Sequence, residues 1–189
     1  GLLVTYLFNK PICAWCLTGI KKQISSNDKI FAITTEYFER KFGIESLLKK
    51  SLIENEISAQ MQLIKVSNTP DGPADCVYKS KDFVNKKEIT IVINPDQFCN
   101  FDFPKSTDLW DVFMPLYVNN TGKSSYVLIK NNKITDVEEK TLISNYASAG
   151  IYGFKNGKIL FYYLEKTLSN EPHKDEEYFI APMISQILR

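Results

Sequence analysis

The clearest buried strand of the chain reads Ile89-Thr90-Ile91-Val92-Ile93, and Asn94-Pro95-Asp96-Gln97 follows it directly. The strand is rich in β-branched residues, which is typical of a strand covered on both faces. Ligands of open α/β sheets bind beyond the carboxyl ends of such strands, so Asp96 holds a position suited to chemistry. An acidic group there can hold Mg²⁺, and the alternative is that Asp96 only caps a turn. Position alone leaves both interpretations open.

Helices and strands alternate in the part of the chain that leads up to this strand. Hydrophobic periodicity and turn residues predict helices over Pro11–Lys22, Glu36–Phe42, Ile44–Leu52 and Ala74–Val84, and strands over Lys29–Thr34, Ala59–Val66 and Glu88–Asn94. This alternation predicts an α/β fold with a Rossmann-like mixed, mostly parallel sheet flanked by helices.

The second half of the chain mixes hairpins with helices. We predict strands over Asp111–Val118, Ser125–Lys130, Lys133–Val137 and Ser148–Phe154, and helices over Lys158–Ser169 and Tyr178–Leu188. Asn131-Asn132 predicts a tight hairpin turn between two of these strands. The sequence shows no internal repeat and no Pro/Gly-rich linker, so we expect a single domain over residues 1–189.

Composition and net charge limit the kinds of partner that we expect this chain to bind. The net charge of the 189 residues is +1, which creates no general field that would attract nucleic acid or an anionic membrane. No apolar run reaches the roughly 18 residues that a membrane span needs. No basic segment precedes the first apolar stretch, so we expect no signal peptide. The many Lys and Asn residues are typical of a low-GC bacterium.

Cys13 and Cys16 form a C-x-x-C pair, which is compatible with a redox pair or half of a zinc site. We favour buried structural thiols, because apolar residues surround the pair at helical spacing and no second C-x-x-C follows. Four unpaired cysteines favour a reducing, cytoplasmic location.

The turn Gly72-Pro73-Ala74 precedes a predicted helix. A turn of this kind can present backbone N–H groups to a nucleotide or a phosphate. The simpler interpretation is an ordinary loop before a helix, and the sequence alone favours it.

Several motifs occur in a specific order along nearly the whole chain. They are Asn9-Lys10-Pro11-Ile12, Gly72-Pro73-Ala74, Asn94-Pro95-Asp96-Gln97, Val137-Glu138-Glu139-Lys140, the segment Ser144–Phe154 and the segment Glu177–Pro182. In this order they resemble the sugar-1-phosphate nucleotidyltransferase family, whose NTP-transferase domain has a GT-A type fold. The segment Ser144–Phe154 is similar to the family's S-N-x-A-x-x-G-I-Y-x-F. Glu177–Pro182 resembles the ending of a branch linked to capsule and surface polysaccharide.

The resemblance implies a set of functional residues. Asp96 would be the ligand of Mg²⁺ and, with Lys140 at the acceptor phosphate, would be catalytic. The backbone of Gly72, Pro73 and Ala74 would face the base. Glu139, Asn145 and Gly150 would also bind the nucleotide or the acceptor.

The chain departs from the family pattern at two places. The family opens with a strand and a G-x-G-x-R loop that cradles the triphosphate, and this chain begins with Gly1-Leu2-Leu3 at about the place where that loop ends. We therefore expect the first strand and the loop to be missing, with weakened triphosphate binding. Pro182 stands where many members place a second metal-binding aspartate.

The resemblance implies transfer of a nucleotidyl group from an NTP to a sugar-1-phosphate or similar phosphorylated acceptor for surface polysaccharide synthesis. The alternative is a non-catalytic nucleotide- or sugar-nucleotide-binding domain of the same fold. A third and weaker alternative is a glycosyltransferase with a D-x-D motif, for which Asp71 and Asp102 offer loose candidates. The expected partners are the NTP and the acceptor, without nucleic acid or membrane, and a homo-oligomer stays open.

Overall fold

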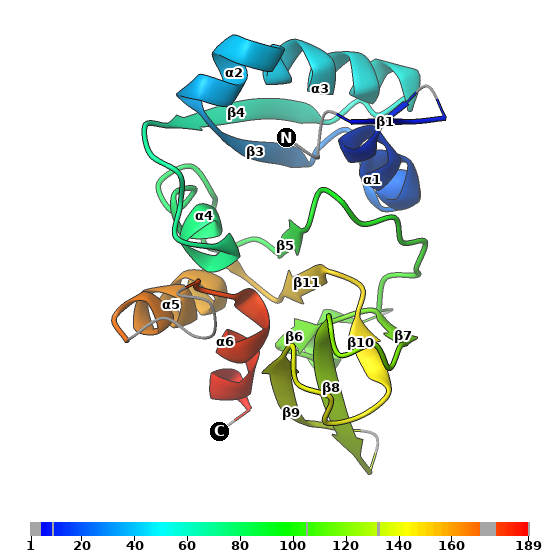
Figure 1. The fold of residues 1–189 in the computed structure, drawn as a ribbon, viewed down its shortest axis with the longest axis vertical. Helices are drawn as coiled ribbons and strands as arrows, with labels where there is room; N and C mark the ends of the chain where they lie inside the picture. The colour runs from blue at the N-terminus through cyan, green and yellow to red at the C-terminus, as the bar shows by residue number, and fades with distance from the viewer. Residues whose placement is uncertain (1–4, 9, 105, 132, 171–176, 189) are drawn as a thin grey trace. The chain divides into compact units, whose positions relative to one another are not determined.

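The computed structural model describes residues 5–8, 10–104, 106–131, 133–170 and 177–188. The chain divides into two compact units, and each is described by itself. Unit 1 contains Gly1–Thr69 and Ile93–Lys105, and unit 2 contains Pro70–Val92 and Ser106–Arg189. Figure 1 labels the elements of both units.

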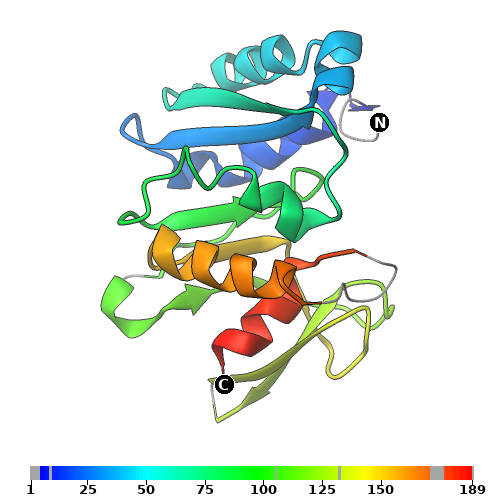
Figure 2. The ribbon, with the colours of Figure 1, turned by 90° about the vertical axis from the view of Figure 1, so that its left-hand side faces the viewer.

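Unit 1 is built around a pair of parallel strands. β3 (Lys29–Thr35) pairs with β4 (Gln60–Val66) from Lys29 opposite Gln60 to Thr35 opposite Val66. The connection between them carries α2 (Glu36–Phe42) and α3 (Ile44–Glu54), which lie on the β4 side of the pair in Figures 1 and 2. The other elements of unit 1 are β1 (Tyr6–Leu7), β2 (Lys10–Pro11), α1 (Ile12–Ile20) and the 3₁₀ helix η2 (Lys21–Gln23).

Local signals set the ends of α2. The Thr35 hydroxyl accepts a hydrogen bond from the Phe38 N–H at 3.2 Å, which satisfies a donor of the first turn. At the other end Gly43 adopts a left-handed conformation with φ of 59°, and its N–H donates to the Glu39 carbonyl. The predicted helix Glu36–Phe42 is therefore confirmed at both boundaries.

Unit 2 contains two sheets and three helices in the part that the structure describes. One sheet has the order β5-β11-β6, and the other has the antiparallel order β7-β10-β8-β9. The strands are β5 (Thr90–Ile93), β6 (Val112–Phe113), β7 (Leu116–Val118), β8 (Ser125–Lys130), β9 (Lys133–Glu139), β10 (Tyr146–Ser148) and β11 (Ile151–Phe154). The helices are α4 (Pro73–Tyr78), α5 (Gly157–Leu168) and α6 (Ile180–Ile187), and a 3₁₀ turn η3 spans Thr107–Leu109. The predicted α/β class is confirmed.

Three predicted elements of unit 2 differ most from those observed. The predicted strand Asp111–Val118 divides into β6 and β7 around Met114-Pro115, because proline has no N–H to give to a strand ladder. The predicted strand Ser148–Phe154 begins only at Ile151, because Gly150 turns the chain with φ of 70°. The predicted helix Ala74–Val84 ends at Tyr78, after which the chain continues in turns.

The core of unit 2 lies between its helices and its strands. α6 packs on β9, and α5 packs on both α4 and α6. The fully or almost fully buried side chains include Val127, Val137, Phe154, Leu160, Leu164, Met183 and Ile184. In α5 the buried Leu160 and Leu164 alternate with exposed positions such as Tyr162, so the helix is amphipathic as its sequence predicts.

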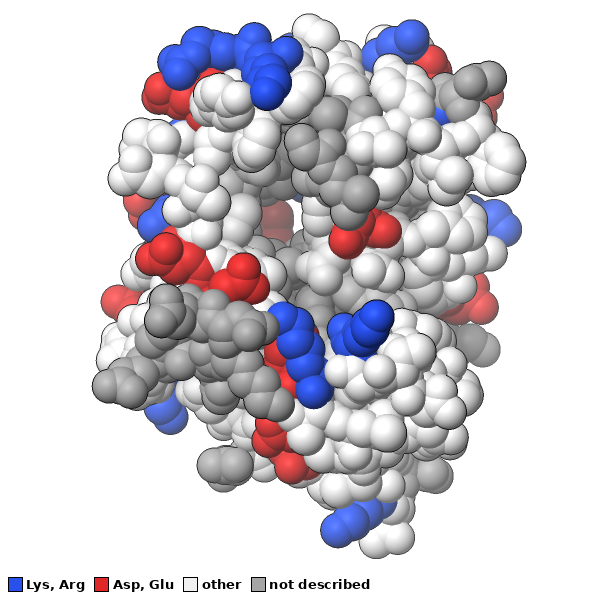
Figure 3. Space-filling view, viewed as in Figure 1, with Lys and Arg blue, Asp and Glu red and all other residues white. Residues whose placement is uncertain are grey.

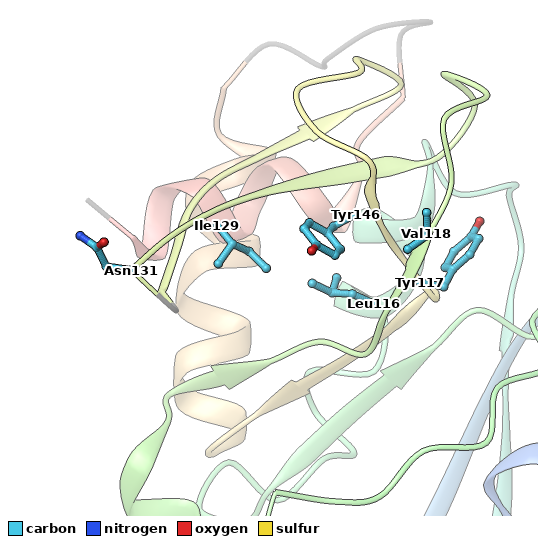
Figure 4. Close-up of a pocket in the computed structure, with 6 residues that line it drawn as sticks. All are labelled: Leu116, Tyr117, Val118, Ile129, Asn131 and Tyr146. Atoms are coloured by element: carbon cyan, nitrogen blue, oxygen red, sulfur yellow. The ribbon is translucent and has the colours of Figure 1, made fainter.

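An open cavity of about 490 Å³ with a mixed polar and apolar lining lies on the four-stranded sheet of unit 2. Leu116, Tyr146 and Ile129 point toward one another there, as Figure 4 shows. The remaining lining residues are Tyr117, Val118 and Asn131, so the lining contains no predicted site residue.

Both basic side chains (Lys, Arg) and acidic side chains (Asp, Glu) are scattered over the face shown in Figure 3. Among the described residues, no helix is both long enough and apolar enough to cross a membrane.

Candidate functional site

Asp96 lies in unit 1, in a turn that directly follows β5. The Gln97 N–H donates to the Asn94 carbonyl at 3.2 Å and closes this turn. The Asp96 carboxylate is exposed, and the Gln97 side-chain amide lies 3.5 Å from its Oδ1. The carboxylate therefore stands at the strand end that the sequence predicts, accessible to a ligand.

α1 holds the segment that follows Asp96. Gly19 of α1 approaches the backbone of Cys99 so closely that an added Cβ would lie 2.7 Å from the Cys99 carbonyl oxygen. Further along, the Gln23 side-chain amide donates to the Phe101 carbonyl at 2.5 Å. Because only glycine permits this approach, α1 fixes the path of the chain beyond the Asp96 turn.

A mostly apolar cavity of about 360 Å³ adjoins Asp96 within unit 1. Trp15 and Phe98 meet edge to face there, with ring centroids 6.2 Å apart. The Trp15 indole N–H donates to the Leu7 carbonyl at 3.0 Å, and the Lys10 ammonium lies 4.8 Å from the indole centroid. The other lining residues are Phe8, Ile12 and Gln97. The Lys-Pro motif thus contributes its lysine to an aromatic wall beside the carboxylate.

The described residues contain no group of three or more His, Cys, Asp or Glu side chains that could hold a metal ion. Asp96 offers one accessible carboxylate. Mg²⁺ commonly binds through one or two carboxylates together with waters and substrate phosphates, so this donor set fits an ion that arrives with a polyphosphate. This single carboxylate does not form a complete set of protein ligands for a metal ion. Pro182 is buried in the first turn of α6 and offers no ligand.

Cys13 and Cys16 are free thiols buried on α1. Burial raises the pKa of Cys13, and burial together with the nearby Cys13 and Asp96 raises the pKa of Cys16 to about 12. Both thiols therefore stay protonated near neutral pH, whereas redox chemistry and zinc binding need the thiolate. The structural interpretation of the C-x-x-C pair is the one these surroundings favour.

Alkylation by iodoacetamide at pH 8 should modify Cys16 roughly 1000-fold more slowly in the native protein than in urea, because the thiolate fraction falls tenfold for each unit of pKa. The unfolded thiol ionises first as the pH rises, so this group's contribution to stability is lost between pH 9.0 and about 12. Mass spectrometry of the Cys16 peptide measures the rate, with the partly exposed Cys99 as an internal reference. Equal native and denatured rates would contradict the burial of this thiol.

The turn Gly72–Ala74 lies in unit 2 and begins α4, with Pro73 in the first helical turn. The Ala74 N–H donates to the Tyr178 carbonyl at 2.8 Å, and the Tyr178 N–H donates to the Asp71 carbonyl at 2.8 Å. The Gly72 carbonyl accepts from the Cys76 N–H. Because proline has no N–H and the Ala74 N–H is engaged, the only N–H that this turn can offer to a base is that of Gly72.

Replacement of Gly72 by alanine should destabilise the protein by about 3 kcal/mol, since it combines backbone strain with a steric clash. Gly72 has φ of 105°, and an added Cβ would lie 2.6 Å from the Tyr178 nitrogen. Gly122→Ala is the matched control, because Gly122 has φ of 74° with nothing near its Cβ position. Urea denaturation should give a clearly smaller loss for the control, and equal losses would contradict the contact with Tyr178.

Glu139 and Lys140 lie at the end of β9 in unit 2. The Ser125 hydroxyl donates a short hydrogen bond to Glu139 Oε2, and the Lys140 N–H donates to the Ser124 carbonyl at 3.0 Å. Lys140 has φ of 51°, a left-handed conformation that is costly for a residue with a Cβ. Such outliers persist where the surrounding structure holds them and are concentrated at functional sites.

The Lys140 side chain is exposed, and its ammonium lies 4.9 Å from the centroid of the buried Phe179 ring. Phe179 directly precedes α6, whose Ser185 accepts a hydrogen bond from the Val137 N–H of β9 at 3.0 Å. α6 therefore anchors the strand that carries Glu139 and Lys140 and also supplies the aromatic ring under the lysine. The arrangement places a cation over an aromatic ring at the end of β9.

Asn145 and Gly150 flank β10. Asn145 is exposed, and its carbonyl accepts from the Asn119 N–H at 2.9 Å. Gly150 is buried, and its N–H donates to the Ser148 hydroxyl at 3.1 Å. The structure therefore places Gly72–Ala74, Glu139, Lys140, Asn145 and Gly150 in unit 2, and it places Asp96 in unit 1.

Sequence reasoning singled out neither Ser125, whose hydroxyl donates to Glu139, nor the buried Tyr152. Tyr152 is 4% exposed, and Ser148 and Ser125 are the neighbours whose hydroxyl groups affect its pKa. Burial raises the pKa of Tyr152, while the two serine hydroxyls act against this shift. In the sequence, Ser148 and Tyr152 are polar residues inside an otherwise apolar stretch. Polar side chains that are buried need an explanation, so this pair was a signal that sequence reasoning could have used.

The family model described as nucleotidyl transferase matches residues 3–189. A nucleoside-diphosphate-sugar pyrophosphorylase from Vibrio cholerae superposes with a TM-score of 0.83 at 16% identity, over 99% of this chain and 79% of that chain. A UDP-glucose pyrophosphorylase in complex with UDP-glucose gives 0.74 at 15% identity, over 99% and 78%. The inositol-1-phosphate CTP transferase from T. maritima gives 0.69 at 14% identity, over 99% and 72%. These likenesses concern the fold.

A comparison with curated protein sequences finds no match. The family model nevertheless extends over nearly the whole chain. The predicted relationship is confirmed at the level of the family, and the chain belongs to the nucleotidyl transferase family.

Proposed function

We propose that this protein transfers a nucleotidyl group from a nucleoside triphosphate to a sugar-1-phosphate or a similar phosphorylated acceptor. The observation that carries the proposal is the end of β9, where Lys140 is held in a left-handed conformation beside a hydrogen-bonded Glu139. A fixed cation next to a carboxylate suits a ligand with a phosphate and hydroxyl groups, since the two side chains recognise opposite kinds of polar group.

The reaction balances without a further reactant. An oxygen of the acceptor phosphate attacks the α-phosphorus of the triphosphate in line and forms a new P–O bond. The bond from this phosphorus to the bridging oxygen breaks, and pyrophosphate leaves. Such transfers need mainly alignment of the two reactants and stabilisation of negative charge.

We assign the roles residue by residue. The Lys140 ammonium would hold the acceptor phosphate, and Glu139 would accept hydrogen bonds from acceptor hydroxyl groups. Gly72 would offer its N–H to the base, while Pro73 and Ala74 shape the turn. Asn145 and Gly150 would border the ligand from the two ends of β10.

Asp96 would be the protein ligand of Mg²⁺. When bound, the ion would offset negative charge on the phosphates of the nucleotide. The exposed carboxylate at the end of β5 supports this role, because it offers an oxygen donor to an ion that also needs waters and phosphate oxygens.

The similarity of Glu177–Pro182 to a capsule-linked ending supports a place in surface polysaccharide synthesis in a bacterium. The four free cysteines support a cytoplasmic location.

The test is a panel assay. The protein is incubated with each of the common NTPs, Mg²⁺ and a set of sugar-1-phosphates, and pyrophosphate is measured. Release that requires one NTP, one acceptor and Mg²⁺ supports the transfer. No release with any pair, together with measurable nucleotide binding, would reject the enzyme and favour the non-catalytic binding domain.

A further inference from the structure

The loop between β7 and β8, residues 119–124, connects two of the candidate site residues of unit 2. At its first residue, the Asn119 N–H donates to the Asn145 carbonyl at 2.9 Å. At its last residue, the Ser124 carbonyl accepts from the Lys140 N–H at 3.0 Å. The two ends of the loop are therefore attached to Asn145 and to Lys140.

The Asn119 side chain holds the two ends of this loop together. Its amide nitrogen donates to the Tyr117 hydroxyl at 3.0 Å and to the Ser124 hydroxyl at 3.2 Å. Its Oδ1 accepts from the Thr121 N–H at 2.8 Å. A backbone N–H can only donate, so the amide oxygen must face Thr121, and both amide hydrogens are available to the two hydroxyl groups. The loop thus engages every polar group of this side chain.

Two further contacts hold the same loop. The Tyr117 and Ser124 hydroxyl oxygens lie 3.2 Å apart, within hydrogen-bond distance. The Gly122 N–H donates to the Tyr126 hydroxyl at 2.7 Å, and Tyr126 is fully buried on β8. Because a close-packed core fixes the position of a buried ring, this contact ties the middle of the loop to unit 2.

Strand register brings Lys140 to this loop. An unbroken register from the β8–β9 hairpin turn would place Glu138 opposite Ser125. An irregularity of β8 shifts the pairing by one residue, so that Ser125 faces Glu139 instead. The carbonyl that meets the Lys140 N–H is consequently that of Ser124, the last residue of the loop. Such bulges occur next to functional sites, where they change which side chain points where.

The hydrogen bond to the Ser124 carbonyl stabilises an unfavourable backbone conformation at Lys140. With φ of 51°, Lys140 lies in the left-handed region, which is costly for a residue with a Cβ. Such conformations persist only where the surrounding structure holds them. The direction in which the lysine side chain leaves the strand depends on this conformation. A contact that fixes Ser124 therefore also limits where the ammonium can lie.

We propose that Asn119 is a positioning residue for acceptor binding, because it fixes the Ser124 carbonyl that holds the backbone of Lys140. Asn119 itself would not touch the acceptor. This inference rests on the proposed function, since it takes the Lys140 ammonium as the group that contacts the acceptor phosphate.

The neighbouring Asn120 provides a matched control. It is the same type of residue at the next position of the loop, it is exposed, and its side chain forms no hydrogen bond with any described residue. Asn119→Ala and Asn120→Ala remove the same atoms from the same loop. Urea denaturation of both variants measures the cost to stability, so that effects on binding can be compared at known stability.

Amide hydrogen exchange tests the contact with Lys140 without turnover. The Lys140 N–H should exchange about tenfold faster in Asn119→Ala than in wild type, because its acceptor carbonyl is no longer fixed. Asn120→Ala should leave this exchange rate unchanged. An equal Lys140 exchange rate in wild type and in Asn119→Ala would overturn the positioning role.

The kinetic experiment uses the NTP that the wild-type protein accepts and glucose-1-phosphate as the probe acceptor, or the sugar-1-phosphate that the panel assay selects in its place. Asn119→Ala should raise the KM for this acceptor about fivefold, because the ammonium loses its fixed position. The kcat and the KM for the NTP should stay unchanged, whereas a merely structural role would lower stability in urea and change all three together. Asn120→Ala should change none of them.

A double mutant tests the route through Ser124. Ser124→Ala removes the hydroxyl that accepts from Asn119 but keeps the carbonyl that accepts from Lys140. It should therefore raise the acceptor KM by less than Asn119→Ala does. Asn119→Ala combined with Ser124→Ala should equal Asn119→Ala alone, since both residues act through one contact. Multiplying effects in the double mutant would overturn this route.

The two proposals fail in different ways. A wild-type protein that releases no pyrophosphate with any pair overturns the proposed function, and the positioning role fails with it. A wild-type protein that is active but whose Asn119→Ala variant keeps its acceptor KM overturns the positioning role alone. Equal rises of the acceptor KM in Asn119→Ala and Asn120→Ala would do the same.

Discussion

Asp96→Asn should lower the rate of pyrophosphate release at least about 100-fold, because it removes the charge that holds Mg²⁺ and leaves the shape of the side chain unchanged. The Asp96 turn is closed by backbone groups of Asn94 and Gln97, so the substitution should not disturb its path. The measurement is kcat at saturating NTP and acceptor, together with the Mg²⁺ concentration that gives half of the maximal rate.

Asp102→Asn is the matched control for this substitution. Asp102 is also exposed and lies in the same segment of unit 1, and it is one of the alternative acidic candidates. It should retain nearly all of the activity. Loss in Asp102→Asn with activity preserved in Asp96→Asn would move the metal role from one aspartate to the other.

Lys140→Met should raise the KM for the acceptor by about 30-fold, because a charge-assisted contact with a phosphate is lost while the length of the side chain is kept. The KM for the NTP should change little. Lys133→Met removes a positive charge from the opposite end of β9 and should have no effect on either KM. A rise in KM for the NTP instead of the acceptor would contradict the role assigned to Lys140.

The variant Lys140→Gly separates the effect of the Lys140 charge on acceptor binding from the effect of its backbone conformation. Lys140→Gly also removes the ammonium but tolerates φ of 51° without strain. It should therefore bind the acceptor as weakly as Lys140→Met without losing stability in urea. If Lys140→Gly kept the acceptor KM of the wild type, the backbone conformation would matter for binding and the ammonium would not.

Local sequence signals were sufficient where the deciding interactions are local. Thr35 and Gly43 mark the two ends of α2, and both act through neighbours within four residues. The hairpin at Asn131 was equally predictable, because its turn requires a residue that tolerates φ of 50°. The strand before Asp96 could be recognised from its β-branched residues alone, although the observed β5 is shorter than predicted.

Only part of the candidate site could be predicted from the sequence. The motif order identified Asp96, Glu139 and Lys140 as residues of interest, but it did not show what holds them. The hydrogen bond from the Ala74 N–H to the Tyr178 carbonyl joins segments about 100 residues apart in the sequence. No local sequence pattern predicts such a contact. The same applies to the contact of Gly19 with Cys99.

The sequence by itself determined the family, the α/β class, the position of Asp96 at a strand end and most helices and strands, because these depend on composition and on short-range periodicity. Only the tertiary structure decided that Glu139, not Glu138, faces Ser125, because a one-residue shift in β8–β9 pairing sets this and the hydrophobic alternation of the strands does not reveal it.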